Sequence, residues 1–301
     1  MAVIRSLFTV PLVLIANQVS AIDIGMQEAI APRVDRWAVQ YGYNSSERGS
    51  FYQHGQVLSN ATELNVTRQH VRLVRTFDWD GRPSAFYAQL PYQKIETENV
   101  ALSPRFRAND ASGGMGDLTL LLATWLHNDR QKGHYLTVGS YLFLPTGDYD
   151  VKNTKIINTN PGGNRYRAAL QVAHHLQLTD NIGWMMAFDT LWSGKNNDAY
   201  LFSATPVTFR QASLHSFQTA LSYRLSPRHS VGTAYFYSAG GESSLAGVKQ
   251  NDAIRTQRFE LTSNFFVLPQ TRLTLQYGAD LKIENGFKEK RHLNFSITQV
   301  F

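Results

Sequence analysis

Histidine, serine and carboxylate side chains are the groups in this chain that could carry out catalysis. The sequence has 9 histidines and no cysteine, so disulfides, thiolate metal sites and cysteine nucleophiles are excluded. A serine hydrolase needs a nucleophile, a base and an orienting group close together, and no serine and histidine here have a spacing that singles out such a pair. His174 and His175 are adjacent, so they point to opposite faces of a strand and cannot bind one metal ion together. We therefore expect no enzyme activity, no metal site and no cofactor.

Charged side chains of both signs instead alternate with apolar ones along the chain. In residues 273–283, for example, Leu275 and Tyr277 share one face while Gln276 and Asp280 share the other. Alternation of period two indicates β-strands with two different faces. The charged residues that we place on the polar faces are Arg165, Arg167, Asp189, Arg224, Arg258, Glu260, Asp280, Lys282 and Glu284. In a water-filled interior such charges tune ion selectivity, whereas in a filled interior they pair across strands.

The same alternation predicts a series of strands with two kinds of connection. The predicted strands cover residues 36–43, 64–77, 85–93, 117–126, 134–144, 165–177, 182–188, 213–225, 230–238, 254–267, 273–283 and 290–301. Short turns, such as 78–81 and 226–229, alternate with mostly longer polar segments at 44–63, 94–116, 145–164, 193–212, 239–253 and 284–289. Transmembrane β-barrels show this asymmetry, because they carry short turns in the periplasm and long loops outside the cell.

We therefore predict an all-β fold, namely a transmembrane antiparallel β-barrel of about 12 strands with both termini in the periplasm. Only 17% of the residues are charged, against about 25% in soluble domains. A soluble β-sandwich is the alternative fold, since it would also alternate. It would not, however, bias its aromatic residues toward strand ends, where membrane barrels carry girdles. The aromatic residues that we assign to these girdles are Trp37, Trp192, Tyr223, Tyr235 and Tyr237.

The first 21 residues have the features of a cleaved secretory signal peptide. Arg5 supplies the positive charge, residues 7–16 form a short apolar core, and Val19-Ser20-Ala21 is a small-residue cleavage site. We expect the mature barrel to comprise residues 22–301. The formal net charge of +6 comes without a cluster of five to eight basic residues, so no nucleic-acid partner is expected.

The last strand ends the chain at a phenylalanine. Phe295, Ile297 and Phe301 lie on one face of the alternating segment 290–301. This segment resembles the terminal assembly signal of Gram-negative outer-membrane barrels, although Gln299 replaces the usual apolar residue and Ser296 a frequent glycine. The resemblance implies three features: recognition by the outer-membrane barrel assembly machinery, contact with outer-membrane lipid, and location in the outer membrane of a Gram-negative bacterium.

Glycine-containing motifs follow one another in the middle of the chain. They are Gly114-Met115-Gly116-Asp117-Leu118, Leu144-Pro145-Thr146-Gly147-Asp148-Tyr149 and Asn160-Pro161-Gly162-Gly163-Asn164, with Leu90-Pro91-Tyr92 upstream. Together they resemble the meta-pathway phenol-degradation outer-membrane proteins over most of residues 60–301. That resemblance implies passage of hydrophobic or aromatic compounds across the outer membrane, and the family name does not denote an enzyme activity.

Two readings of the long segment 145–164 are open. Its glycines can simply allow the chain to change direction at strand ends. The segment can also fold inward and narrow the channel, in which case Asp148, Tyr149, Lys152 and Lys155 would meet the solute.

The predicted function is that of an outer-membrane channel for passive uptake of small molecules, plausibly hydrophobic or aromatic. A structural or surface-contact barrel with a closed lumen is the alternative. An outer-membrane lipid hydrolase is a further alternative, which we disfavour because no resemblance to phospholipase motifs is present.

Overall fold

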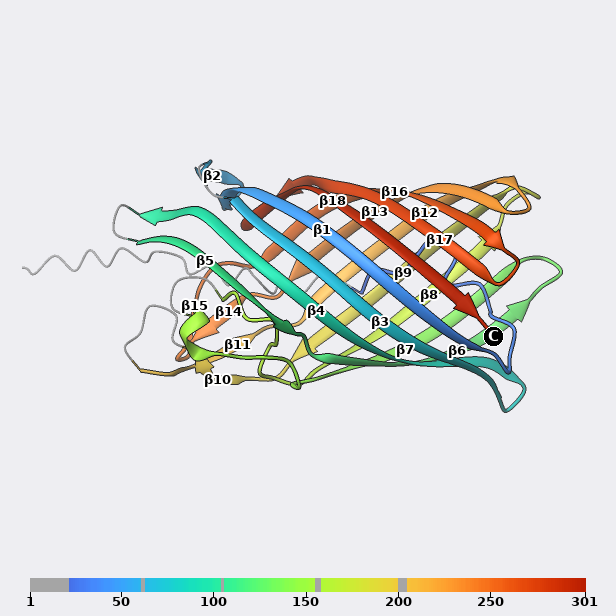
Figure 1. Ribbon diagram of the computed structural model, residues 1–301, viewed down its shortest axis with the longest axis horizontal. Helices are drawn as coiled ribbons and strands as arrows, with labels where there is room; N and C mark the ends of the chain where they lie inside the picture. Colours follow the sequence, from blue (N-terminus) through green and yellow to red (C-terminus); the bar gives the residue numbers. More distant parts are fainter. Residues whose placement is uncertain (1–21, 61–62, 104–105, 155–157, 200–204) are drawn as a thin grey trace, which may run out of the picture.

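The barrel is built from antiparallel strands that follow one another along the chain. The computed structural model describes residues 22–60, 63–103, 106–154, 158–199 and 205–301 (Figure 1). Within these residues 12 strands close into a barrel, and β18 pairs with β1 from Ala38–Val300 to Tyr52–Gly286. The strands are β1 (Trp37–Gln53), β3 (Glu63–Trp79), β4 (Arg82–Ser103), β6 (Leu118–Asp129), β7 (His134–Leu144), β8 (Arg167–Gln177), β9 (Ile182–Ser193), β12 (Leu214–Ser226), β13 (His229–Gly240), β16 (Ile254–Leu268), β17 (Thr271–Ile283) and β18 (Gly286–Val300).

The two ends of the barrel differ in the length of their connections. One end, here called the turn end, carries the tight turns and the C-terminus (Figure 1). At the turn between β3 and β4, Asp80 and Gly81 both have positive φ, at 51° and 73°, as a two-residue hairpin turn requires. The other end, here called the loop end, carries a short helix η1 (Val151–Thr154) and small strands. These are β2 (Gln56–Ser59), β5 (Phe106–Met115), β10 (Asn196–Ala199), β11 (Val207–Gln211), β14 (Ser243–Leu245) and β15 (Val248–Lys249).

The prediction of about 12 barrel strands is confirmed, but two segments expected to be loops are largely strand. β1 continues to Gln53 and pairs with β2, and β4 continues to Ser103 and pairs with β5. These extensions project from the loop end (Figure 1). Lys94 and Glu96 form an exposed ion pair of 2.6 Å on the extension of β4, while Phe51 and Ile95 are buried. The alternation with apolar residues outward therefore ends before the strand does.

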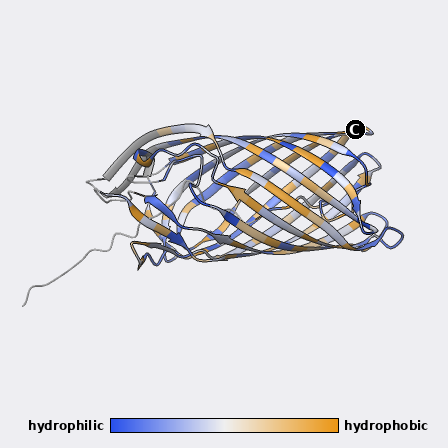
Figure 2. Cartoon of the chain, turned by 90° about the horizontal axis from the view of Figure 1, so that it is seen from below, coloured by the Kyte–Doolittle hydropathy of each residue, from blue (hydrophilic) through white to orange (hydrophobic). Residues whose placement is uncertain are grey.

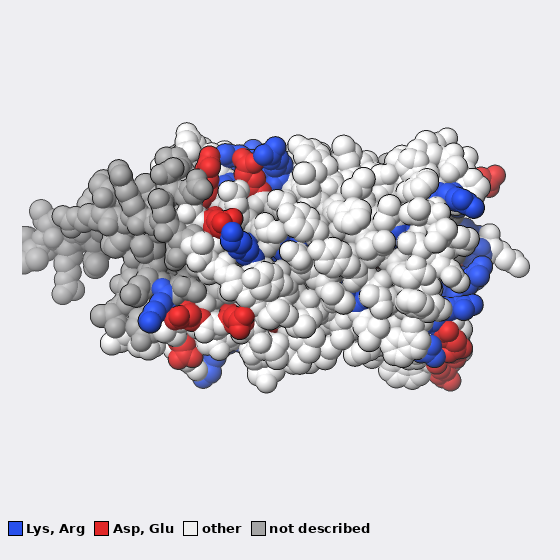
Figure 3. Space-filling view, viewed as in Figure 1, with Lys and Arg blue, Asp and Glu red and all other residues white. Residues whose placement is uncertain are grey.

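The outward face of the barrel is apolar between two charged ends. Hydrophobic residues alternate along the wall (Figure 2), and charged side chains gather near both ends with a mostly uncharged belt between them (Figure 3). Trp37 and Tyr223 lie exposed toward the turn end and Trp192 toward the loop end. Tyr235 is in the middle of β13, so its assignment to a girdle is wrong. A closed barrel with such a belt satisfies every backbone group internally and suits a bilayer.

No described helix is long and apolar enough to cross a membrane.

The apolar belt predicts a depth-dependent cost for charge on the outer wall. Leu261, at the middle of β16, is 50% exposed, and Leu268, the last residue of that strand, is 60% exposed. In lipid vesicles Leu261→Arg should lower the free energy of unfolding by about 2–4 kcal/mol, and Leu268→Arg by at most about 1 kcal/mol. Reversible denaturant titration of the refolded barrel measures both. Equal losses for the two variants would contradict a membrane belt centred on Leu261.

Candidate functional site

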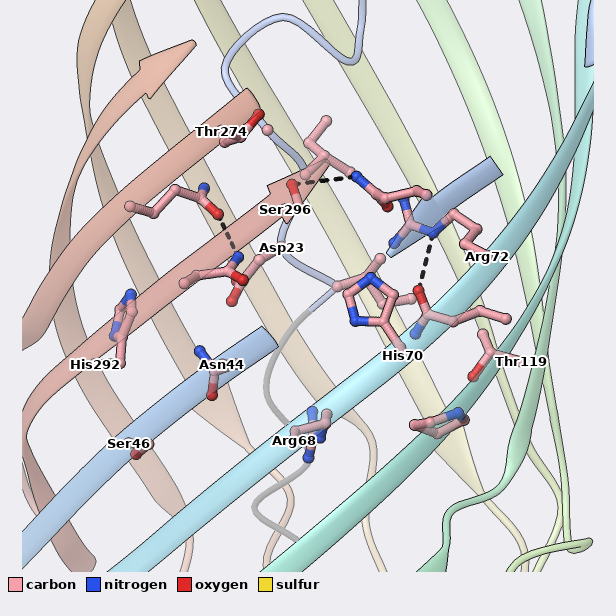
Figure 4. A pocket seen from close by; sticks show the side chains of 18 of the residues that line it. Asp23, Asn44, Ser46, Arg68, His70, Arg72, Thr119, Thr274, His292 and Ser296 are labelled. Carbon is pink, nitrogen blue, oxygen red and sulfur yellow. Dashed lines mark hydrogen bonds between the residues drawn. The ribbon is translucent and has the colours of Figure 1, made fainter. Parts of the chain in front are cut away.

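The interior of the barrel contains a polar cavity of about 370 Å³. Inward side chains of β1, β3, β4, β6, β7, β8, β16, β17 and β18 line it, together with residues 22–25, 27 and 28 (Figure 4). Arg68, His70 and Arg72 project into it from β3, and His292 from β18. Polar inward residues at every second position are what a barrel with an aqueous interior requires.

The N-terminal segment, defined here as residues 22–36, lies inside the barrel. It begins about halfway along the wall, where Gln171 donates from Nε2 to the carbonyl of Ile22 over 2.7 Å. Its other end is at the turn end, where the amide of Asp35 donates to the carbonyl of Thr76 over 3.0 Å. The segment narrows the lumen between these two points.

Side chains of the wall hold the N-terminal segment mainly by its backbone. The amide of Ile24 donates to Gln218 Oε1 over 3.2 Å, and Gln218 Nε2 donates back to the carbonyl of Ile24 over 2.5 Å. The indole of Trp125 donates to the carbonyl of Ala29 over 2.8 Å, and Arg130 donates to that of Pro32 over 2.6 Å. These bonds satisfy carbonyls that have no strand partner.

Apolar contacts and ion pairs complete this attachment. Ile24, Met26 and Ala29 pack in one buried cluster with small and apolar residues of β8, β9, β12 and β13. Asp23 forms an ion pair with Arg258, and Glu28 forms one with Arg72 at 3.8 Å. Each acidic residue of the segment between positions 22 and 28 thus faces an arginine of the wall.

A second charged network joins β1, β16 and β18 within the cavity. His292 Nδ1 is 2.8 Å from Glu289 Oε2, and its Nε2 is 3.2 Å from Glu260 Oε2. Glu289 also accepts a 2.5 Å bond from Ser46 and pairs with Arg48 at 3.5 Å. The side chains of this network are at most 11% exposed, so their charges are balanced by one another.

Several residues predicted on the polar faces do point inward. Arg167, Arg258 and Glu260 line the cavity. Asp189 and Asp280 are buried at 3% and 8% exposure. Asp280 accepts a 2.7 Å bond from the amide of Glu289, and Arg258 is its partner in the β16–β17 register.

The other predicted positions on the polar faces need correction. A register shift between Arg258–Asp280 and Gln257–Lys282 reverses the alternation, so Lys282 is exposed and Ile283 is buried instead. Glu284 lies beyond the end of β17 and pairs with Arg255 at 3.3 Å. Arg224 keeps the inward parity, but it is exposed near the turn end of β12.

Arg165 is buried at the loop end and does not line the cavity. Its Nη2 donates to Gln211 Oε1 over 2.7 Å, and its guanidinium lies 4.7 Å from the ring centre of Phe209. Burial lowers the pKa of Arg165 to about 9. The residue therefore fastens the loop structure to β11 and is not among the residues that line the cavity.

The glycine-containing motifs converge at the loop end of the cavity. Asp117 accepts bonds from the amides of Gly147 at 3.2 Å and Gly163 at 3.0 Å, and it pairs with Arg167 at 3.5 Å. A Cβ on Gly147 would lie 2.7 Å from the backbone of Gly116 and of Gly162. Only glycine permits this backbone approach, which explains why the motifs occur together.

The segment 145–164 reaches the cavity through Pro161, not through the residues predicted to meet a solute. Pro161 lines the cavity, and its carbonyl accepts a 2.8 Å bond from Gln93. Asp148 is bonded to the backbone of Met115 over 2.7 Å. Lys152 is exposed on η1, and Lys155 lies outside the described residues.

Tyr149 belongs to the loop structure rather than to the cavity. Its hydroxyl donates to the carbonyl of Asp198 over 3.0 Å and accepts a 2.8 Å bond from Asn196. Burial raises the pKa of this hydroxyl. The prediction that Asp148, Tyr149 and Lys152 contact a solute in the lumen is therefore not met by this arrangement.

The most important site residues missed from the sequence are the N-terminal segment and the arginines of β1 and β3. Arg68 and Arg72 share one face of the predicted strand 64–77, and Val71 and Leu73 share the other face. The alternation therefore predicts that the two arginines point inward. Arg48 fell in a segment expected to be a loop. The N-terminal segment has no period and gave no signal of its position.

The ends of the chain are only partly described. The predicted signal peptide, residues 1–21, lies outside the described residues. Phe295, Ile297 and Phe301 are 37%, 38% and 63% exposed, and all three lie on or just after β18. They therefore have the outward exposure that an assembly signal needs.

A closed antiparallel barrel with an apolar outer belt and a polar cavity defines the class of outer-membrane β-barrel channels. Residues 46–292 match the protein family described as "Putative MetA-pathway of phenol degradation". The chain belongs to this family. A search among curated proteins finds no match.

Solved structures agree on the class. An outer membrane channel from Pseudomonas putida F1 is 25% identical, with a TM-score of 0.85 over 93% of this chain and 100% of that chain. The β-domain of the Bordetella autotransporter Brka has a TM-score of 0.55 and 10% identity over 88% and 99% of the two chains. The translocator domain of NalP from Neisseria meningitidis has a TM-score of 0.51 and 9% identity over 90% of each of the two chains. The two autotransporter domains share the fold alone.

The contacts of the N-terminal segment predict that neutralising Asp23 and Glu28 loosens its attachment to the barrel wall. A thiol introduced by Ala29→Cys would be the only cysteine of the chain and is fully buried beside Trp125. We expect Asp23→Asn with Glu28→Gln to speed its labelling by a charged thiol reagent about tenfold, since two partly buried ion pairs contribute about 1 kcal/mol together or slightly more.

The control for this experiment is Val57→Cys, which is exposed at the loop end and should label at one rate in both backgrounds. Labelling of Ala29→Cys as fast as Val57→Cys without the charge substitutions would show that the segment is not held in the lumen.

Proposed function

We propose that this protein is a passive outer-membrane channel for small aromatic compounds. The observation that carries the proposal is the cavity, which combines polar side chains with the aromatic side chains of Tyr87, Tyr141 and Phe143. Tyr87 and Tyr141 form an edge-to-face pair with ring centres 6.4 Å apart. Membership of a family named for phenol degradation and similarity to an outer membrane channel from Pseudomonas putida F1 support the same function.

The mechanism needs no covalent step. Solute would exchange water for the polar wall and stack its ring on aromatic side chains. Among the described residues, no group of three or more histidine and acidic side chains is placed to hold a metal ion. The proposal assigns no catalytic residue, metal or cofactor, and the partners it names are a small-molecule solute and outer-membrane lipid.

The orientation in the membrane is part of the proposal. The loop end would face outward and the turn end, with the C-terminus, would face the periplasm, as in other outer-membrane barrels, whereas Ile22 lies in the lumen about halfway along the wall. A solute entering from the loop end would pass Pro161, reach the cavity and then meet the N-terminal segment. Movement of this segment would open the remaining path.

A barrel with a permanently closed lumen is the second candidate function. The hydrogen bonds and apolar packing that hold the N-terminal segment favour it. In that case the outer surface and the loops would carry the function.

Ionic current through single barrels in a planar bilayer distinguishes the two candidates. A channel should give current steps that phenol and benzoate reduce and that glucose, a polar solute without an aromatic ring, leaves unchanged. The chain with Asp23→Asn and Glu28→Gln should open more often, because its N-terminal segment is held less tightly. Absence of current from both folded chains would reject the channel and leave the structural barrel.

We propose that the terminal strand is read by the barrel assembly machinery. Removing Phe301 should lower the amount of barrel in the outer membrane several-fold without changing spontaneous folding into vesicles. Heat-modified mobility of membrane fractions measures assembly in both settings. Phe265→Ala, which also removes an exposed phenylalanine, is the matched control and should assemble normally.

A further inference from the structure

Three arginines line the cavity toward its loop end. Arg68 lies on β3, Arg48 on the neighbouring strand β1, and Arg167 at the start of β8, and all three line the cavity. The charges of Arg48 and Arg167 act on Arg68, and that of Glu289 opposes them. Figure 4 shows Arg68 among the side chains that line the cavity. Like charges so close together attract an anion.

The carboxylates at this position balance two of the three charges. Glu289 pairs with Arg48 and Asp117 pairs with Arg167, each at 3.5 Å. Arg68 donates only to the amide oxygen of Gln93, at 3.2 Å from Nη2 and 3.4 Å from Nε. Over the described part of the chain, no carboxylate lies within ion-pair distance of Arg68. The guanidinium of Arg68 therefore has no carboxylate in direct contact with it.

The other arginines near this position are fixed in place by aromatic rings. The guanidinium of Arg167 lies 4.7 Å from the ring centre of Phe143, and that of Arg72 lies 4.4 Å from that of Tyr87. Arg72 also donates to Gln89 and pairs with Glu28. The cavity thus offers Arg68 as a free cation beside aromatic side chains that are already in position.

We propose that Arg68 binds the carboxylate of an aromatic acid as it passes through the cavity. A guanidinium and a carboxylate match in a planar arrangement of two hydrogen bonds, and the ring of the acid would lie against Tyr87 or Phe143. This inference rests on the proposed channel function and refines it, since it names the anionic members of the aromatic class as the preferred solutes.

The charge distribution explains why the acid and not the neutral phenol is preferred. A neutral hydroxyl would have to accept a bond from Arg68 without balancing its charge. A carboxylate supplies the missing negative charge and accepts two parallel hydrogen bonds from the guanidinium, which a single hydroxyl cannot do. Cyclohexanecarboxylate has the carboxylate without an aromatic ring, and chloride has the negative charge alone. Comparing both with benzoate therefore separates the contribution of the charge from that of ring stacking.

The experiment measures block of single-channel current by benzoate and by phenol in the full mature chain. We expect Arg68→Gln to raise the concentration of benzoate that halves the current about tenfold or more, as loss of a charged hydrogen-bond partner implies. Phenol block should stay within about twofold. Arg68→Lys keeps the charge without the planar pair of donors, so its effect should fall between those of the parent chain and Arg68→Gln.

Arg224→Gln is the matched control, because Arg224 is an exposed arginine outside the cavity and should leave benzoate block unchanged. Circular dichroism and heat-modified mobility show that each variant is folded. Equal block by benzoate and phenol, unaltered in Arg68→Gln, would overturn the carboxylate site and leave the channel function standing. Absence of block by any aromatic compound in a conducting barrel would instead reject the aromatic channel itself.

Stronger block by cyclohexanecarboxylate than by benzoate in the parent chain would contradict the role of the aromatic side chains. Block by chloride as strong as that by benzoate would reduce the site to a general anion site and overturn the assignment to aromatic acids.

Discussion

The hydrogen bonds between β18 and β1 are the interaction on which the rest of the structure depends. A lipid bilayer offers no partner to an unpaired backbone amide or carbonyl, so the barrel must close and its wall must be continuous. The pairing runs almost the whole length of both strands. Closure fixes which side chains point outward, and it leaves the interior as the only place for polar groups.

Because the outer wall is apolar, the charged side chains face the lumen and must find their partners there. Inward arginines, carboxylates and His292 satisfy one another across neighbouring strands, and the N-terminal segment supplies Asp23 and Glu28 to two further arginines. The segment therefore has an electrostatic role as well as a steric one. Without it, Arg72 and Arg258 would lose their carboxylate partners and, like Arg68, have no carboxylate in direct contact with them.

The wall could be predicted from the sequence, but its contents could not. Hydrophobicity alternates with a period of two in each strand, because one face contacts lipid and the other the polar lumen. The residue types of Leu275 and Gln276 are therefore enough to predict that the first points outward and the second inward. Lys282 was misplaced because a bulge changes the period without any residue that marks it. The N-terminal segment is held by backbone carbonyls, as at Ala29, and carbonyls are the same for every residue type. Asp117 illustrates the same limit, since its three partners are distant in sequence.

Closure also decides which part of the protein can move. Opening the wall would expose paired backbone groups to lipid at a cost of several kcal/mol for each group, so the wall is the most stable part of the structure. The N-terminal segment lies inside the lumen and not against lipid, so water that enters the lumen can replace its broken hydrogen bonds at little cost. Elements of low local stability are those that move in function. In the proposed channel, a change between closed and open states would fall on residues 22–36 and on the arginines that face them, which would place control of passage in the same cavity that receives the solute.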